Sequence, residues 1–337
     1  MKARIRGHKI VSFLPYEKDY LIDFLTRKVD SEKFDLVCCN SLDFEEVMRH
    51  LNEATIILHG PVEPFLSQEI LEAAPNLQLI QFGSIGYAQV DINAASKLKI
   101  PVANNAAFCS ISVAEYTIMA ILLLLRQTLK ATSGIRDGNW NAQEMIRETN
   151  DLHELNKMTL GILGLGSIGS WVARIAKGFG CKTIYNKRNR LPINVEHDLG
   201  VEFVEFNTLI RNADVLTIHA PLTDQTRNLI NRNVLAQMKT GSYIINTARR
   251  DLIDEEALYE ALVSQKIRGA CIDVPRSPND REKFLLKYGS LDNVLVTPHI
   301  SALTIDSMER SKNQLSENVR RIIEGEKPLF VINETDL

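Results

Sequence analysis

Three glycines in the middle of the chain have the spacing of a phosphate-binding turn. Gly164, Gly166 and Gly169 follow an apolar run over 159–163. In such a turn the first glycine permits a tight bend, the second lets the backbone approach a pyrophosphate, and the third lets a helix pack on a strand. Apolar residues at helical spacing over 167–179 supply that helix. The pattern therefore predicts a bound dinucleotide held by Gly164, Gly166, Ser167, Ile168 and Gly169.

A basic run stands where such units contact the adenosine ribose. NAD-preferring units place an acid about 20 positions after the first glycine, whereas cations accommodate the 2′-phosphate of NADP. Lys187 lies 187 − 164 = 23 residues beyond Gly164, and the run reads Lys187, Arg188, Asn189, Arg190 with no acid in it. Charged hydrogen bonds from these side chains suit a phosphate dianion. The run favours NADP over NAD, and the alternative is a solvated basic loop.

The elements around this turn alternate between short apolar strands and helical stretches. Before the turn this alternation predicts a small parallel α/β domain. Its strands are expected near 10–14, 36–39, 55–58 and 77–82, and its helices near 16–28, 44–51 and 69–74. After the turn, strands are expected near 182–185, 202–204, 215–218, 243–246, 270–272 and 294–296, with helices near 209, 234 and 255–262.

A charged helical pattern over 304–323 follows the last strand and is expected to return to the first domain. We therefore predict two α/β domains. The first is a discontinuous, flavodoxin-like domain over 1–103 and 299–337, where a substrate would bind if the second domain holds a cofactor. The second, over 104–298, is a Rossmann-type domain with a doubly wound parallel sheet.

Composition narrows the class of protein. The chain has 337 residues with 45% hydrophobic content, enough for a core in each domain. A net charge of -3 gives no reason to expect nucleic acid or a membrane surface as partner. Five cysteines without a CxxC pair argue against a disulfide framework or a metal site, so a reducing cytoplasm is expected. The longest apolar run, 118–125, is too short to span a bilayer.

Further motifs stand in order along nearly the whole chain. They are Gly83-Ser84-Ile85-Gly86-Tyr87 with Asp91, Pro101-Val102-Ala103-Asn104, Ser112-Val113-Ala114-Glu115, His219-Ala220-Pro221-Leu222-Thr223, Asn246-Thr247-Ala248-Arg249, Ile272-Asp273-Val274 and Val296-Thr297-Pro298-His299. With the glycine turn, they make the chain resemble the D-isomer-specific 2-hydroxyacid dehydrogenase family.

The resemblance implies a division of labour among site residues. Arg249 would anchor a substrate carboxylate, because a guanidinium offers two parallel hydrogen bonds, and would polarise the adjacent carbonyl. His299 would donate a proton to the carbonyl oxygen and accept it in the reverse direction. Backbone amides at Ser84, Ile85 and Gly86 would hold the carboxylate's other side. Asp273 would bind the nicotinamide carboxamide, and the remaining implied cofactor contacts are His219, Pro221, Thr226, Thr247 and Ala248.

Two departures from the family pattern stand out. Arg250 occupies the place of a glycine, so the glycine is replaceable or Arg250 adds charge near the cofactor or substrate mouth. The glutamate that contacts the catalytic histidine in the family, about five residues after the equivalent of Asp273, falls here near Ser277 or Pro278. Asp280 or Glu282 is a candidate replacement, and the alternative is that His299 acts without one.

We predict an NADPH-dependent enzyme, with NAD as a second possible cofactor, that reduces a small 2-oxoacid of the glyoxylate or hydroxypyruvate type to the D-2-hydroxyacid. The resemblance also implies a homodimer joined through the nucleotide domain, which fits the apolar helix at 111–125 and a polar excursion over 133–155. One alternative is an NAD(P)-sensing regulatory protein of the same fold with little turnover. Another is a dehydrogenase of formate or a different substrate without the 2-hydroxyacid group.

Overall fold

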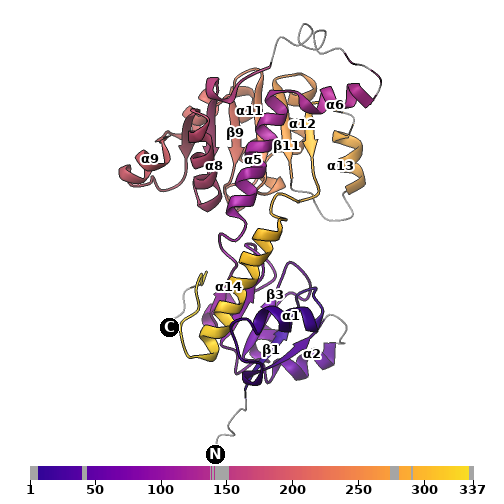
Figure 1. Ribbon diagram of the computed structural model, residues 1–337, viewed down its shortest axis with the longest axis vertical. Coiled ribbons are helices and arrows are strands. Elements are labelled where there is room, and N and C mark those ends of the chain that lie inside the picture. Colours follow the sequence, from indigo (N-terminus) through magenta and orange to yellow (C-terminus); the bar gives the residue numbers. More distant parts are fainter. Residues whose placement is uncertain are drawn as a thin grey trace, which may run out of the picture. The chain divides into compact units, whose positions relative to one another are not determined.

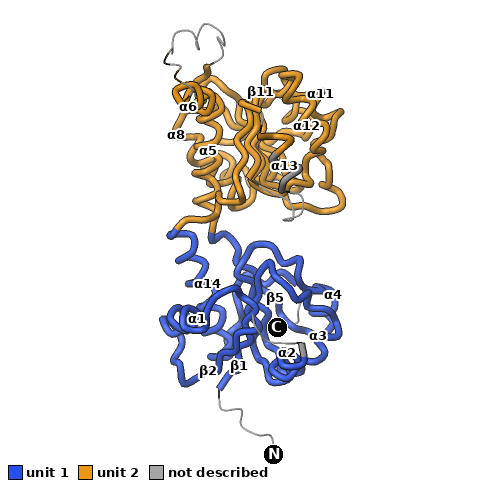
Figure 2. Tube along the Cα trace, turned by 90° about the vertical axis from the view of Figure 1, so that its right-hand side faces the viewer, with its two compact units in different colours: residues 1–108, 305–337 blue, residues 109–304 orange. Residues whose placement is uncertain are grey.

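The chain folds into two compact units. The computed structural model describes residues 7–39, 44–136, 138, 140, 152–273, 281–289 and 291–333. Unit 1 comprises residues 1–108 and 305–337, and unit 2 comprises residues 109–304 (Figure 2). The last helix of the chain, α14 (Ile305–Ile323), belongs to unit 1.

Unit 1 is built on a parallel sheet of five strands in the order β2-β1-β3-β4-β5. This is the flavodoxin-type order. The strands are β1 (His8–Ser12), β2 (Phe34–Cys38), β3 (Ile56–His59), β4 (Leu79–Phe82) and β5 (Val102–Ala103). The central strands β3 and β4 are buried at every position, as expected where helices cover both faces of a parallel sheet.

Helices cover the two faces of this sheet with separate apolar layers. Alternate strand residues such as Ile10 and Leu58 pack with α14 and with α1 (Lys18–Leu25). The residues between them, such as Val11 and Ile57, pack with the remaining helices. Those are α2 (Phe44–Leu51), α3 (Gln68–Glu72) and α4 (Ile92–Lys97), and a short turn η1 (Ser31–Lys33) precedes β2. Period-two alternation thus decides which layer each strand residue joins.

Unit 2 is built on a parallel sheet of seven strands in the order β12-β11-β10-β9-β6-β7-β8. Read from its first strand, this is the Rossmann order with one strand added at an edge. The strands are β6 (Thr159–Leu163), β7 (Lys182–Asn186), β8 (Val201–Phe203), β9 (Val215–Ile218), β10 (Ser242–Asn246), β11 (Ile267–Ile272) and β12 (Val294–Val296). The predicted fold class is confirmed: unit 1 is a flavodoxin-like α/β unit and unit 2 is a Rossmann-type α/β unit.

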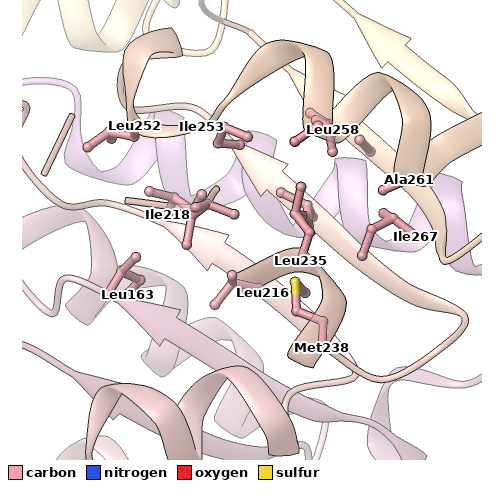
Figure 3. Packing of buried hydrophobic residues seen from close by; sticks show 14 of the residues in the cluster. Leu163, Leu216, Ile218, Leu235, Met238, Leu252, Ile253, Leu258, Ala261 and Ile267 are labelled. Atoms are coloured by element: carbon pink, nitrogen blue, oxygen red, sulfur yellow. The ribbon is translucent and has the colours of Figure 1, made fainter. Parts of the chain in front are cut away.

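Two helical layers enclose the seven-stranded sheet (Figure 1). One layer contains α5 (Ser110–Leu125), α8 (Ser167–Gly178) and α9 (Ile193–Leu199). The opposite layer contains α10 (Phe206–Asn212), α11 (Arg232–Gln237), α12 (Glu255–Val263) and α13 (Arg281–Tyr288). Leu163, Leu216 and Ile218 from the strands belong to one apolar cluster with Leu235 and Leu258 from the helices, and Figure 3 shows Leu216 next to Leu235. Full burial of one such side chain contributes about 1.5–3 kcal/mol.

Three further elements complete unit 2. They are helix α6 (Thr128–Arg136) and the short turns η2 (Leu155–Lys157) and η3 (Arg250–Leu252). The predicted polar excursion over 133–155 begins inside α6, and residues 137, 139 and 141–151 lie outside the described residues. Within the described part no single helix is long and apolar enough to cross a membrane. The pair formed by α5 and α6, with a bend of 65° between them, reaches the length and apolar composition of a membrane span, on those two criteria alone.

Candidate active site

Six neighbouring strands of unit 2 end on one row of paired residues. In the pairing register of the sheet, one residue of each strand lies opposite one residue of the next. From β7 through β6, β9, β10 and β11 to β12 these residues are Asn186, Leu163, Ile218, Asn246, Ile272 and Val296. The predicted site residues of unit 2 all follow this row, from Gly164, next after Leu163, to Thr226, eight residues after Ile218. The carboxyl edge of a parallel sheet is where ligands bind in such folds. The topology therefore gathers these residues along one edge.

Two of the three glycines in the turn are required by the protein's own packing. Gly164 has a φ of +93°, and a Cβ there would lie 2.6 Å from the backbone nitrogen of Ala220. A Cβ on Gly169 would lie 2.5 Å from the carbonyl oxygen of Gly164. A larger residue at either position would force the turn open, so neither glycine by itself indicates a ligand.

Gly166 differs, because a Cβ at this position would meet no atom of the protein within 4 Å. It is the exposed N-cap of α8, and no side chain caps that helix. The first amides of a helix lack partners within the helix and carry a partial positive charge. Space without protein atoms, next to uncapped amides at Ser167 and Ile168, fits the pyrophosphate of a dinucleotide.

The basic loop after β7 is held at its far end. Arg190 donates to Glu196 on α9 through Nε at 2.9 Å and Nη2 at 2.8 Å, and its guanidinium lies 5.6 Å from the Phe203 ring centroid. The pKa of Glu196 is lowered to about 2, mainly by the hydrogen bond from Arg190 and to a smaller extent by the one from the Tyr185 hydroxyl. The arginine predicted to join in phosphate binding therefore already has a buried carboxylate partner.

The other residues of this loop remain available. Lys187 is half-buried, Arg188 and Asn189 are exposed, and none of the three side chains bonds to a described residue. No acidic side chain takes their place, because β7 ends in Asn186, whose side-chain amide donates to the Val204 carbonyl at 2.9 Å. Two free cations, Lys187 and Arg188, thus stand immediately beyond the end of β7.

The loop after β9 lies against the glycine turn. The His219 amide donates to the Leu163 carbonyl at 2.7 Å, and the ring Nε2 lies 2.8 Å from the Thr217 hydroxyl. Burial lowers the pKa of His219 to about 3, so the ring is neutral, and its Nδ1 has no partner in the described part of the chain. Thr226 closes the same loop by donating to the Pro221 carbonyl at 2.7 Å.

Asn246, the last residue of β10, shapes the loop that carries Arg249. Its side chain donates to the Arg249 carbonyl at 2.9 Å and accepts from the Ala248 amide at 3.1 Å. Arg249 is exposed, and its guanidinium donates to the Ala248 carbonyl at 2.7 Å but to no carboxylate of the described residues. Thr247, in the same loop, has a buried hydroxyl without a partner among the described residues. Arg249 thus presents an unneutralised cation at this edge.

Arg250, where the family has glycine, points into the protein. Its side chain is 10% exposed, forms an ion pair with Glu255, and lies 4.3 Å from the Phe284 ring centroid. Pairing with Glu255 and burial of the side chain disfavour the hypothesis that Arg250 adds charge near the cofactor or substrate mouth. The neighbouring arginines have opposite environments because η3 starts between them and turns the second side chain toward α12 and α13.

His299 lies in a tight loop after β12. The residue is exposed and has a φ of +61°, a left-handed conformation uncommon for residues other than glycine. No carboxylate among the described residues contacts its imidazole. Asp280 and the side chain of Glu282, the predicted replacements for the family's glutamate, lie outside the described residues.

Asp273 holds this loop in place. The residue is fully buried, and its carboxylate accepts from the Thr297 hydroxyl at 2.7 Å, the Ile300 amide at 2.8 Å and the Ser301 amide at 2.8 Å. These bonds span both sides of His299. This role of Asp273 and the part of Thr297 in it are not predicted from the sequence, because spacing alone does not show which loop a buried carboxylate faces.

The predicted carboxylate-binding loop of unit 1 follows β4. The Ser84 hydroxyl donates to the Gly86 carbonyl at 2.7 Å, and Asn104 donates to the Ile85 carbonyl at 2.9 Å. The backbone amides of Ser84, Ile85 and Gly86 donate to no described residue. The loop is ordered through its carbonyls and leaves three N–H groups for an anion.

In the described part of the chain, no group of three or more His, Cys, Asp or Glu side chains is arranged to hold a metal ion. The described cysteines are free thiols, and Cys39, Cys109, Cys181 and Cys271 are buried.

Comparison with known proteins gives consistent matches. The family described as D-isomer specific 2-hydroxyacid dehydrogenase, NAD binding domain, matches residues 118–301. The chain is 36% identical over 283 residues to a hydroxypyruvate reductase of Thermotoga maritima, which covers 84% of this chain and 89% of that protein. It is 34% identical over 313 residues to a glyoxylate reductase of Thermofilum pendens, covering 89% of this chain and 88% of that one. A solved glyoxylate reductase from Paecilomyes thermophila aligns with a TM-score of 0.82 and 28% identity, covering 97% and 98%.

Proposed function

Because this chain belongs to the D-isomer-specific 2-hydroxyacid dehydrogenase family of oxidoreductases, we propose that it reduces a small 2-oxoacid to the D-2-hydroxyacid with NADPH. The observation that carries the proposal is the row of paired strand ends in unit 2. Arg249, whose guanidinium pairs with no described carboxylate, and His299, whose imidazole is exposed, each stand three residues beyond that row.

The residues of unit 2 fit a dinucleotide. The open space at Gly166 and the uncapped amides of α8 suit its pyrophosphate. The orphaned Nδ1 of neutral His219 and the orphaned Thr247 hydroxyl are buried polar groups available to a ligand. When bound, the nicotinamide cofactor supplies the hydride. The residues assigned to hold it are those of the glycine turn, Lys187, Arg188 and the loops that follow β9 and β10.

The chain's own groups supply the remaining chemistry. Arg249 binds the substrate carboxylate and stabilises negative charge developing on the carbonyl oxygen. The protonated imidazole of His299 gives that oxygen its proton, and the neutral ring takes it back in the reverse direction. Within unit 1, the three free amides at Ser84, Ile85 and Gly86 are suited to an anion such as a carboxylate.

NADPH preference is supported by the two cations after β7. A 2′-phosphate brings up to two negative charges, which free Lys187 and Arg188 side chains can bind by charged hydrogen bonds. Asn186 ends the strand where an acid would bind the two ribose hydroxyls of NAD. Arg190 is excluded from this role in the proposal because Glu196 holds it.

The relatives named glyoxylate and hydroxypyruvate reductase support small substrates. The experiment is oxidation of NADPH and NADH measured against a panel of glyoxylate, hydroxypyruvate, pyruvate and longer 2-oxoacids, with formate tested in the oxidative direction. Turnover of at least one short 2-oxoacid is expected. Tight cofactor binding with no turnover of any member would instead favour an NAD(P)-sensing regulatory protein.

We also propose a homodimer formed through unit 2. Helix α5 keeps apolar surface that its own unit does not cover, with Met119 43% exposed and Leu122 and Leu123 half-buried. Light scattering on the purified chain is expected to give twice the mass of one chain, and Met119→Glu should lower it to that of one chain.

A further inference from the structure

The loop that carries His299 depends on one buried carboxylate. Three donors reach Asp273, from Thr297 before the histidine and from Ile300 and Ser301 after it. A left-handed residue costs about 1–2 kcal/mol, and hydrogen bonds to a charged group are strong enough to offset that cost. The conformation of His299, at a φ of +61°, is therefore maintained by its neighbours rather than by its own preference.

The Thr297 hydroxyl connects this carboxylate to a second residue. A hydroxyl has one hydrogen to donate and two lone pairs to accept with. Thr297 donates its hydrogen to Asp273 at 2.7 Å, and its oxygen also lies 2.5 Å from the Tyr116 hydroxyl oxygen. In this second contact Thr297 must accept, so Tyr116 donates. The bonds run in one direction, from Tyr116 to Thr297 to Asp273.

Tyr116 comes from a distant part of the sequence and is suited to remain a donor. It lies on α5, 181 residues before Thr297, and is half-buried. Burial raises the pKa of its phenol, which keeps the hydroxyl protonated. Cys271, fully buried on β11, has its sulfur 3.9 Å from the same oxygen and donates weakly to it. The phenol is thus fixed from two sides.

We propose that Tyr116 is a positioning residue for the catalytic histidine: its hydroxyl fixes the Thr297 side chain, which with Asp273 sets the backbone conformation at His299. The inference rests on the proposed function, since it assigns His299 the proton-transfer role. The bonds of Asp273 fix the backbone on both sides of His299, and the Tyr116 hydroxyl acts on the imidazole through this backbone.

The decisive variant is Tyr116→Phe, which removes one oxygen and leaves the ring. The Ile300 and Ser301 amides should then exchange with solvent deuterium roughly 3- to 10-fold faster, because Thr297 is no longer held. In the reductive reaction kcat should fall by a similar factor, with the KM for NADPH unchanged. The matched control is Tyr288→Phe, since Tyr288 is buried in the same unit and donates its hydroxyl to the Glu255 carbonyl at 3.2 Å.

Thr297 provides the second variant pair. Thr297→Val removes the hydroxyl at nearly constant shape and should lower kcat at least as much as Tyr116→Phe. Thr297→Ser keeps the hydroxyl and should restore both exchange protection and kcat. Because Tyr116 acts through Thr297, adding Tyr116→Phe to Thr297→Val should lower kcat no further.

Several results would overturn the proposal. They are unchanged exchange at Ile300 and Ser301 in Tyr116→Phe, an equal increase in Tyr288→Phe, full additivity with Thr297→Val, or faster exchange with an unchanged kcat. Failure of the proposed function looks different, because the wild-type protein would then reduce no 2-oxoacid. The exchange measurement still decides in that case whether Tyr116 holds the loop.

Discussion

The loop after β7 and the loop after β12 start from the same row of paired residues, yet they are held in contrasting ways. In the first, Lys187 and Arg188 have no partner among the described residues, and only Arg190 at the far end is fixed, by Glu196. In the second, a fully buried Asp273 binds one hydroxyl and two amides around His299.

The difference matches the physical demands of the two proposed tasks. Attraction between a cation and a phosphate falls off gradually with distance, so long side chains can find the phosphate from many starting conformations. Proton transfer requires heavy atoms about 2.6–3.2 Å apart, so a small displacement of the ring is costly. Loose cations suit binding, and a fixed backbone suits proton transfer.

The largest effect that tests this contrast is expected at His299. His299→Ala should lower reductive kcat by roughly 10²–10⁴-fold, the usual cost of losing a general acid, while the Kd for NADPH stays the same. Steady-state kinetics and fluorescence titration of the cofactor measure the two quantities. His197→Ala, at an exposed position on α9, is the control and should leave both unchanged. Near-normal turnover in His299→Ala would remove the proton-transfer role.

The free cations are expected to show the reverse pattern. Replacing both Lys187 and Arg188 by Ala should weaken NADPH binding by about 1.5–3 kcal/mol, the cost of losing charged hydrogen bonds, with kcat at saturating cofactor little changed. The Kd for NADH should stay nearly constant. Titrations with both cofactors at two salt concentrations measure this. Equal losses for NADPH and NADH would contradict the assignment of these cations to the 2′-phosphate.

The fixed loop should also contribute to stability, unlike the free cations. Asp273→Asn keeps the shape but turns an –NH₂ group toward a donor that previously had an acceptor, which should cost about 1–2 kcal/mol of unfolding free energy. Urea denaturation of wild type and variant measures it. The Lys187→Ala and Arg188→Ala double variant is the comparison and should unfold like wild type. Equal stability of Asp273→Asn and wild type would mean that its three bonds contribute nothing net.

At the carboxyl edge of the unit 2 sheet, the sequence predicts the features that depend on short motifs and on the spacing of residues. The glycine turn, the strand ends and the order of Arg249 and His299 along the chain all follow from spacing or from motif resemblance. It does not predict the Arg190–Glu196 pair, because that contact depends on how α9 packs beside β7. Tyr116 escapes notice because a tyrosine in an apolar helix looks like a core residue. Arg250 misleads for the opposite reason, since a charge next to a site residue suggests solvent.

The smallest expected effect concerns the Arg190–Glu196 pair, which fixes the far end of the loop after β7. In the folded protein the hydrogen bond from Arg190, and to a smaller extent that from Tyr185, lowers the pKa of Glu196 to about 2. A glutamate in the unfolded chain has a pKa of about 4.3. A depressed carboxyl pKa gives stability that is fully present above about pH 4.3 and is lost as the pH falls through about 2. The stability difference between wild type and Glu196→Gln should therefore be constant above about pH 5 and shrink as the solution is acidified.

Urea denaturation of both proteins between about pH 6 and pH 3 measures this difference. Glu202→Gln, at an exposed position on β8 without an ion pair in the described structure, is the matched control, and its curve should run parallel to that of wild type. The Kd for NADPH at neutral pH should not change in Glu196→Gln, because Lys187 and Arg188 bind the phosphate without the pair. A higher Kd for NADPH in Glu196→Gln would show that the Arg190–Glu196 pair also positions Lys187 and Arg188. The loop after β7 would then resemble the loop of His299 in needing a fixed backbone for its task.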